Sequence, residues 1–255
     1  SCMRQGQYTG TVNKAETSPV ELTKMMVGRE VVLEIEKKKA HQGNVVLDVK
    51  DIWTSGEKEI SKIRGISFDV KAGEIVGIAG IDGNGQSELV EAIAGLRKVE
   101  KGTVTLDGVD ITNKTVKNIR EAGLTHIPED RNTRGLNRTF TIGENLVEVE
   151  IDKDPIKKGG IINMAAIVQR AKEMIEKFDI RPADGKLPTS SLSGGNAQKV
   201  VVAREVNLGG KLLIASQPTR GVDIGAIESI RTILQDVKEK GLGVLLVSAE
   251  LEEIM

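Results

Sequence analysis

Aromatic side chains and cysteine are both scarce in this chain of 255 residues. Phenylalanine, tryptophan and tyrosine together make up 2% of it, too few for the stacked aromatic platforms that bind single-stranded nucleic acids. The one cysteine, Cys2, cannot form an internal disulfide, which fits a reducing compartment. We expect Cys2 to be an inert thiol in a mobile terminal segment.

An excess of one charge and long apolar runs are also missing. The 36 Lys and Arg nearly balance the 37 Asp and Glu, so no basic field points to a nucleic-acid partner. No apolar run approaches the roughly 20 residues that a membrane-spanning helix needs. We therefore expect any membrane role to act through partner subunits. The 39% of hydrophobic residues is sufficient for a sizeable core.

A glycine-rich stretch, Gly80-Ile-Asp-Gly-Asn-Gly-Gln-Ser87, follows an apolar run predicted to be a buried strand and precedes a helical pattern. In such a turn the backbone N–H groups converge, and the helix dipole favours an anion. The P-loop pattern G-x-x-x-x-G-K-[ST] is matched except at its lysine, which is Gln86 here. The stretch predicts a phosphate site without the lysine charge. Its candidate nucleotide-binding residues are Gly80, Asp82, Gly83, Asn84, Gly85, Gln86, Ser87 and Glu88.

Two kinds of strand are predicted around this loop. Val45–Val49 and Gly65–Val70 read as strands with a turn at 55–56 between them, and Gly102–Ile111 as a hairpin that turns at Asp-Gly. Leu212–Ala215 and Gly243–Val247 are apolar runs between helices, as in a parallel sheet. We predict an α/β fold with a parallel-sheet core and a small antiparallel β subdomain.

Residues 139–207 are predicted to be mainly helical, and a second amphipathic helix is predicted over Gly225–Lys240. Two interpretations of one apolar face in the first segment stay open: packing into the core, or a groove for a partner. Its members recur at helical spacing: Met164, Ile167, Val168, Ala171, Met174, Ile175 and Phe178.

A second motif identifies a family. Leu192-Ser-Gly-Gly-Asn196 precedes a helical pattern, and Leu212–Ala215 leads into Ser-Gln-Pro-Thr-Arg-Gly-Val-Asp223. Together with the glycine-rich loop, and in this order over about 200 residues, these motifs resemble the ATP-binding subunits of ABC transporters. The resemblance implies a P-loop NTPase fold with a helical subdomain, here about 139–207. It also implies ATP and Mg²⁺ as cofactors.

Further motifs resemble importers that carry two ATPase domains in one polypeptide and serve nucleosides or simple sugars. They are Met25–Glu30, Pro128–Arg131, Pro218–Gly221 and Ser248–Glu253. The resemblance implies that 1–30 is the tail of a first ATPase domain, 31–44 a linker, and 45–255 most of a second domain, truncated at its C-terminus. Gln86 and Ser216-Gln217 are more similar to the nucleoside branch, since the sugar branch usually has Arg and Asp-Glu there. A simple-sugar importer is the alternative.

The chemistry that the resemblance implies is altered at five positions. The phosphate-binding lysine is Gln86, the metal-positioning aspartate is Ser216 and the catalytic glutamate is Gln217. The glutamine that senses the γ-phosphate is Glu129, and the switch histidine is Ala249. Ser87 keeps the hydroxyl that would ligate Mg²⁺. Phosphoryl transfer needs positioned charge, a metal and a group that orients water, so we expect weak or static nucleotide binding without hydrolysis in cis.

The signature residues Ser193, Gly194 and Gly195 match the family. In its head-to-tail dimers each signature completes the partner domain's ATP site, so we predict that these three residues act in trans. The implied partners are the first ATPase domain, transmembrane permease subunits and, indirectly, an extracytoplasmic substrate-binding lipoprotein. The implied location is the cytoplasmic side of the membrane, as a peripheral subunit. Nucleic acid is not among the implied partners.

Several interpretations remain open. Trp53 could stack on adenine, as an aromatic often does in the family, or pack within its strand. His126 is expected to be a loop or strand-end residue without chemistry. Glu129–Arg131 could couple to the membrane subunit or form a solvated charged loop. A non-transport ABC protein and an interaction module that binds no nucleotide are further alternatives, so an enzymatic activity of this domain stays undecided.

Overall fold

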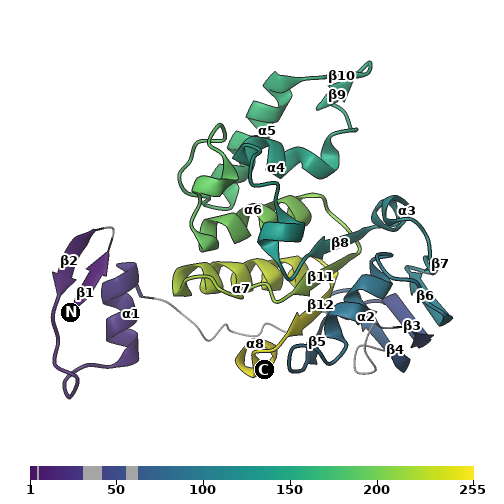
Figure 1. Cartoon of the computed structure of the whole chain (residues 1–255), viewed down its shortest axis with the longest axis horizontal. Helices are drawn as coiled ribbons and strands as arrows, with labels where there is room; N and C mark the ends of the chain where they lie inside the picture. The colour runs from purple at the N-terminus through teal and green to yellow at the C-terminus, as the bar shows by residue number, and fades with distance from the viewer. Residues whose placement is uncertain (5, 31–41, 56–62) are drawn as a thin grey trace.

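The computed structural model describes residues 1–4, 6–30, 42–55 and 63–255. Residues 31–41 of the predicted linker, and Gly56 of the predicted turn, lie outside the described residues. Figure 1 shows a central parallel sheet with helices above it, an antiparallel sheet at one side and a helical part at the top. This arrangement confirms the predicted α/β fold with its parallel core, antiparallel β subdomain and helical part.

The parallel sheet has the strand order β5-β12-β11-β8. Its strands are β5 (Ile75–Ala79), β12 (Gly243–Ser248), β11 (Leu212–Ser216) and β8 (Leu124–Ile127). The register pairs Ser216 with Val247 and Ser248 with Ala79, so the strands end together. The carboxyl ends of parallel strands are where ligands bind in such sheets. Gly80 and Gln217 directly follow β5 and β11, so both lie at this edge.

The antiparallel sheet has the order β4-β3-β6-β7. Its strands are β4 (Arg64–Lys71), β3 (Val45–Trp53), β6 (Lys101–Leu106) and β7 (Val109–Asp110). Asp107 and Gly108 join the last two strands, both with positive φ, 48° and 77°. Two such residues are typical of the tight turn that matches the twist of a hairpin. The predicted Asp-Gly hairpin is thus confirmed.

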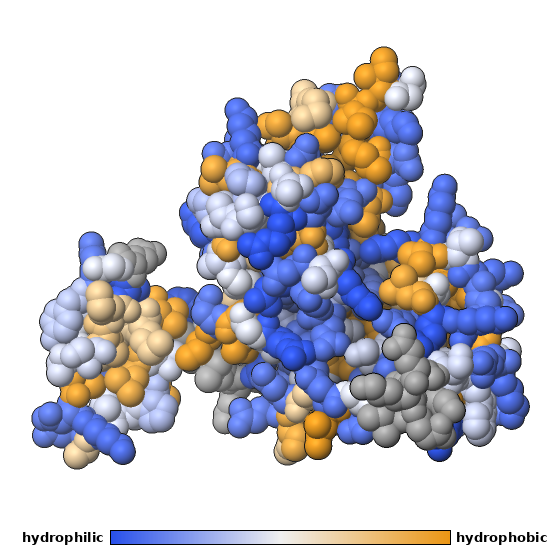
Figure 2. Space-filling view, viewed as in Figure 1, coloured by the Kyte–Doolittle hydropathy of each residue, from blue (hydrophilic) through white to orange (hydrophobic). Residues whose placement is uncertain are grey.

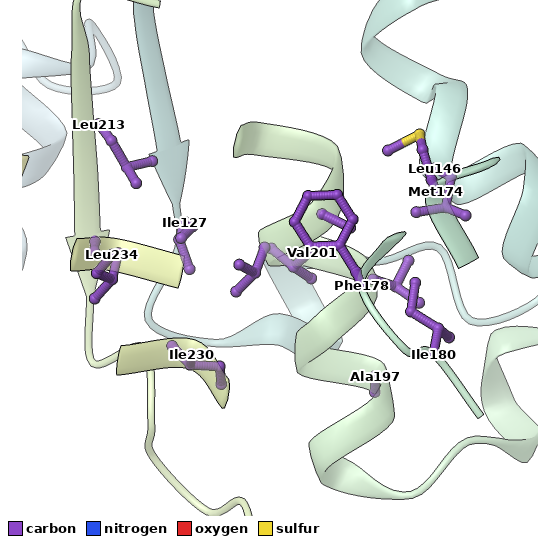
Figure 3. Close-up of a cluster of buried hydrophobic side chains, with 14 of the residues drawn as sticks. Ile127, Leu146, Met174, Phe178, Ile180, Ala197, Val201, Leu213, Ile230 and Leu234 are labelled. Carbon is purple, nitrogen blue, oxygen red and sulfur yellow. The ribbon is translucent and has the colours of Figure 1, made fainter. Parts of the chain in front are cut away.

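Two hydrophobic cores cover the two faces of the parallel sheet, because successive side chains of a strand point to opposite faces. Leu212 and Ile214 belong to the core shared with the antiparallel sheet, while Leu213 and Ala215 face the helices. Figure 3 shows part of the second core, where Val201 lies between Leu213 of the sheet and Met174 of the helical part. The two cores therefore hold the strands, and with them the strand ends, from both faces of the sheet.

The helical part contains α4 (Ile142–Val147), α5 (Met164–Lys177) and α6 (Gly194–Asn207). It also contains 3-10 turns at Glu148–Glu150 and Thr189–Ser191 and a hairpin of β9 (Lys157–Lys158) and β10 (Ile161–Ile162). The hairpin has no counterpart among the predicted elements.

The apolar face of α5 is divided between the two interpretations. Its inner members, among them Ala171 and Met174, are buried, so core packing is confirmed for them. Met164 and Val168 are 59% and 54% exposed. These two belong to a surface and not to the core.

Further helices lie along the chain between the strands and after the last one. They are α2 (Gln86–Ile93), α3 (Val116–Glu121), the π-helix Arg131–Gly135, α7 (Ile224–Glu239) and α8 (Leu251–Ile254). The amphipathic helix predicted over Gly225–Lys240 is confirmed as α7, which buries Ile230 and Leu234. In the part of the chain that the structure describes, we find no helix with the length and hydropathy to cross a membrane.

Residues 1–30 form a hairpin and a helix. β1 (Cys2–Arg4) pairs with β2 (Gln7–Gly10), and α1 (Pro19–Val27) packs on both. Cys2 is buried between them, so the expectation of a mobile terminal thiol is wrong. The helix also contacts α7, where Arg29 pairs with Glu228 at 2.5 Å. At the other end of the predicted linker, residues 42–44 hydrogen-bond to residues 72–74.

Candidate functional site

The glycine-rich loop connects the end of β5 to the start of α2, as its sequence predicts. Gly83 and Gly85 have φ of 89° and 103°, values that favour glycine. A Cβ on Gly80 would lie 1.9 Å from the Gln86 Nε2 atom, so the Gln86 side chain folds back over Gly80. The backbone thus has the shape of a phosphate loop, and the uncharged amide of Gln86 lies over its first residue.

A cavity of about 140 Å³ lies between this loop and the ends of β8, β11 and β12. The structure brings seven residues of the sequence-predicted site to its wall: Asp82, Gly83, Gln86, Ser87, Glu129, Ser216 and Gln217. Gly80, Asn84, Gly85 and Glu88 belong to the loop and its helix but do not line the cavity. Residues that complete the wall are Val90, Glu91, His126, Pro128, Arg134, Arg220 and Val247.

A chain of polar contacts crosses the mouth of this cavity. The Ser87 hydroxyl donates to Glu129 Oε2 at 2.8 Å, and Arg220 Nη1 donates to Glu129 Oε1 at 2.5 Å. Arg220 Nη2 lies 3.2 Å from Asp82 Oδ2. Sequence reasoning did not single out Arg220 for the site, although its position five residues after the end of a predicted strand was a usable signal. The segment that follows β11 therefore brings a positive charge, that of Arg220, to the cavity.

The floor of the cavity is neutral and polar. Burial, with smaller effects of Arg120 and Arg134, lowers the pKa of His126 to about 4. His126 is therefore uncharged near neutrality, and its Nε2 atom and the Ser216 hydroxyl are both buried without a hydrogen-bond partner. His126 is the last residue but one of β8, near the strand end as expected, and it also lines the cavity. Buried groups of this kind are usually satisfied by water or a ligand.

An ion pair lies on the α2 side of the wall. Glu91 Oε1 is 2.7 Å from Arg134 Nη1, and Arg97 binds its other oxygen. Burial raises the pKa of Glu91, but the two arginines outweigh burial and hold that pKa below its ordinary value. Glu91 is thus an anion already matched by cations.

The oxygen donors of the site fit a magnesium ion in kind, because Mg²⁺ prefers hydroxyl, carboxylate and phosphate oxygens. Ser87 would hold it, and bound magnesium would neutralise phosphate oxygens. Ser216 adds no carboxylate. Gln217 spans Asp82 and the Ala249 backbone through its amide, at 3.3 and 3.2 Å, and an amide cannot accept a proton from water. The cavity can therefore bind a phosphate chain but has no general base at this position.

The signature residues lie outside the cavity, at the start of α6. Ser193 is the N-cap of that helix, and its hydroxyl accepts hydrogen bonds from both nitrogens of Asn196. A Cβ on Gly195 would lie 2.5 Å from Asp223 Oδ2, and one on Gly194 would lie 3.0 Å from the Gly221 oxygen. Gly195 therefore requires glycine for close packing, and a side chain at Gly194 would need its neighbours to shift slightly.

The charged segment after β8 is bound on three sides. Glu129 faces the cavity, and Asp130 caps the π-helix by accepting from the Asn132 N–H at 2.8 Å. Arg131 donates to the backbone oxygens of Arg220 and Gly221 at 2.7 and 3.0 Å. These contacts anchor the segment, in which Asp130 is exposed, and both a solvated charged loop and a coupling role stay predictions.

Trp53 stands apart from the cavity at the end of β3. Its Nε1 donates to Asp51 Oδ1 at 2.8 Å, and Lys101 Nζ lies 5.4 Å from the ring centroid. Trp53 is not among the residues that line the cavity. Packing within the strand accounts for these contacts, and adenine stacking stays a prediction.

A larger groove of about 580 Å³ lies in the helical part, between α4, α5 and residues 179–186. Met164 and Val168 line it, which accounts for their exposure. Figure 2 shows hydrophobic residues gathered at the top of the molecule, over β10 and α5. Ile161, 76% exposed, continues this apolar surface beyond the groove. A partner-binding role for the outer members of the α5 face therefore stays open.

Comparison with known proteins gives the family. Residues 63–220 match the family model described as ABC transporter. The chain is 45% identical over 253 residues to the guanosine import ATP-binding protein NupO of Bacillus subtilis and to the nucleoside import ATP-binding protein NupA of Lactococcus lactis. In each case it covers 99% of this chain and 50% of the relative. A ribose import ATP-binding protein, RbsA of Shouchella clausii, is 36% identical with 49% of its length covered. The chain thus spans about half the length of the curated relatives it matches.

Solved structures agree with this assignment. A nucleotide-free ATP-binding cassette from an ABC transporter superposes with a TM-score of 0.69 and 25% identity, over 83% of this chain and 84% of that one. A dimeric cassette in a post-hydrolysis state, bound to ADP and phosphate, shows the same fold at 0.69, over 82% and 90% of the two chains. On the evidence of its motifs, its strand order and these matches, the chain belongs to the ABC transporter family and has the fold of that family's ATP-binding domain.

Proposed function

We propose that this chain is an energy-coupling ATP-binding domain of an ABC importer for nucleosides. Its own phosphate site binds nucleotide weakly or statically and does not hydrolyse it. Its signature loop completes the active ATP site of a partner domain. The partner is a first ATPase domain in the same polypeptide. Residues 1–30 are the tail of that first domain, and residues 45–255 form the second domain.

The observation that carries this proposal is the set of side chains at the cavity. Gln86, Glu129 and Gln217 line it where the family places lysine, glutamine and a catalytic glutamate. Ser216 and Ala249 stand where the family has the metal-positioning aspartate and the switch histidine. General-base catalysis alone contributes roughly 10²- to 10⁴-fold, and the change of Gln86 removes a charge-assisted contact of about 1.5–3 kcal/mol. The five changes together argue against turnover at this site.

The separation of the signature from the cavity supports action in trans. Ser193 begins α6 and none of the signature residues lines the cavity that Gln86 and Ser87 bound. A helix N-terminus with a hydroxyl at its cap is suited to contact an anion. We infer that the anion belongs to ATP held by the partner domain.

The proposed substrate is a nucleoside because relatives named for guanosine and nucleoside import are 45% identical, whereas those named for ribose import are 36–37% identical. A simple-sugar importer is the alternative. A thermal-shift panel of nucleosides and monosaccharides on the cognate substrate-binding lipoprotein discriminates the two, and stabilisation by sugars alone would contradict the nucleoside proposal.

The proposed location is the cytoplasmic face of the cell membrane, with permease subunits docked on the helical part. The apolar groove beside α5 supports such a contact, since a groove of this character fits an amphipathic helix. Substrate contacts would lie in the other subunits.

Two measurements on the purified chain test the nucleotide site. Calorimetric titration with ATP and ADP should show binding, and phosphate release with Mg²⁺-ATP should stay at the level of a protein-free control. A domain that binds neither nucleotide would support the alternative of an interaction module. A robust magnesium-dependent rate, lost in Gln217→Ala, would contradict the non-hydrolytic site.

A further inference from the structure

One carboxylate occupies an unusual position in the phosphate site. The two oxygens of Glu129 are shared between the Ser87 hydroxyl, at 2.8 Å, and the Arg220 guanidinium, at 2.5 Å. Glu129 thus joins the phosphate loop to the segment that follows β11. A hydroxyl and a guanidinium that converge on one anion are also the donors that bind a phosphate oxygen.

Arg220 is one of two arginines among the described residues that line the cavity. Its two terminal nitrogens contact Glu129 and Asp82, and Asp82 belongs to the same loop as Gln86. The other arginine of the wall, Arg134, is already held by Glu91. Arg220 is therefore the cation best placed to replace the missing lysine.

The contacts of Arg220 can be exchanged. The side chain of Arg220 is 52% exposed, and those of Asp82 and Glu129 are 54% and 34% exposed. Ion pairs with this exposure are screened and individually weak. The backbone of Arg220, in contrast, is fixed by Arg131, which donates to its carbonyl oxygen. The guanidinium can move while the segment that carries it stays in place.

We propose that the Glu129 carboxylate is an internal stand-in for the terminal phosphate, and that Arg220 is the phosphate-binding cation of this site. On binding, the terminal phosphate takes the place of the carboxylate between Ser87 and Arg220, and the carboxylate turns out of the mouth. This inference rests on the proposed function, since it assumes that the cavity binds a nucleotide. It assigns the charge that Gln86 does not supply.

The test is a titration of the 255-residue chain with ATP, ADP and AMP, with magnesium and with EDTA. Charge-assisted hydrogen bonds are strong enough that Arg220→Ala should weaken ATP binding about 10- to 100-fold. Its effect on AMP should be small, because AMP lacks the terminal phosphate. Glu129→Gln removes the competing anion and should tighten ATP binding about tenfold.

The matched control is Arg181→Ala, which removes another exposed arginine paired with a carboxylate, Asp179, in the helical part. It should leave all three affinities unchanged, and thermal melting checks that every variant is folded. Arg220→Lys should restore part of the ATP affinity, because it returns the charge without the planar fork.

Each other outcome has a defined meaning. Equal ATP affinity of the wild type and Arg220→Ala would overturn the assignment of Arg220 and leave the proposed function standing. Weaker magnesium-dependent binding in Glu129→Gln would overturn the stand-in and identify the carboxylate as a metal ligand. Failure of both the wild type and Glu129→Gln to bind any nucleotide would overturn this inference and the proposed nucleotide site together.

Discussion

The phosphate loop, Gly80–Ser87, and the signature segment, Leu192–Gly195, each lead into a helix, but they differ in what they retain. The phosphate loop has the backbone of its family, with glycines at the turns, and different side chains at its cavity. The signature segment has the family's side chains, a capped helix and two tightly packed glycines. One region keeps a shape, and the other keeps a shape with its chemistry.

The proposed function accounts for this difference, because the two regions would then bind different nucleotides. A backbone cradle holds a phosphate chain through N–H groups whatever the side chains are, whereas hydrolysis depends on a few charged groups. A domain that only holds nucleotide in cis can lose those groups. A signature that serves another domain's ATP cannot. Four measurements test this difference between the two regions, and they are given in order of decreasing expected effect.

The first measurement concerns the signature hydroxyl. In the assembled importer, Ser193→Ala should lower ATPase activity about 10²- to 10³-fold, the usual effect of removing a donor from a developing charge. The substitution also removes a helix cap, which costs about 1 kcal/mol of stability. Thr115→Ala removes the cap of α3 and is the matched control, with activity unchanged. If both variants lose activity equally, the loss comes from capping.

The second measurement concerns the neutral floor of the phosphate site. Because the pKa of His126 is about 4 in the folded protein and 6.5 ordinarily, the folded chain binds fewer protons than the unfolded chain between these values. The contribution of neutral His126 is fully present above pH 6.5 and is lost as the pH falls to 4. We expect a loss on the order of 3 kcal/mol.

Urea unfolding at pH 7 and pH 4.5 measures this loss, and His126→Gln cancels the effects of other titrating groups. The difference between the wild type and this variant should shrink or reverse at the lower pH. A difference that stays constant with pH would mean that His126 is not buried in its neutral form.

The third measurement concerns the packing of the signature glycines. A Cβ on Gly195 would lie 2.5 Å from Asp223 Oδ2 and 2.9 Å from Ala226 Cβ. Gly195→Ala should therefore destabilise the protein by about 1–3 kcal/mol, as overpacking does. Gly225→Ala on α7 meets only ordinary contacts of 3.4 Å or more and should be neutral or slightly stabilising. Equal melting temperatures of the two variants would show that α6 can shift without penalty.

The smallest effect is expected at the phosphate loop itself. Gln86→Ala removes a neutral side chain, and a neutral hydrogen bond contributes about 0.5–1.5 kcal/mol, so the importer's ATPase rate should fall less than about tenfold. Gln86→Lys alone should not start phosphate release, because Ser216 and Gln217 remain. A loss at Gln86 as large as that at Ser193 would end the asymmetry between the two regions.

Much of the fold could be predicted from local patterns. The Asp107-Gly108 turn and the α7 helix follow from conformational preference and periodicity, which act within a few residues. The hairpin β9–β10 and the burial of Cys2 were beyond such reasoning. Two-residue strands carry no periodic signal, and the burial of Cys2 accompanies the packing of α1 against β1, a contact between separate segments of the chain.

The site divides in the same way. By itself, the sequence predicted the phosphate loop and the signature from residue types at a fixed spacing, and the five altered positions from the resemblance to the family. Only the tertiary structure decided that Arg220 reaches the loop, that Glu129 lies between Arg220 and Ser87, and that His126 is buried beside them. Ser87 and Glu129 lie 42 residues apart along the chain, and Glu129 and Arg220 lie 91 apart, so their contacts depend on which strands are neighbours in the sheet. The charge that Gln86 lacks could therefore be noticed in the sequence, but its replacement could be located only in the folded protein.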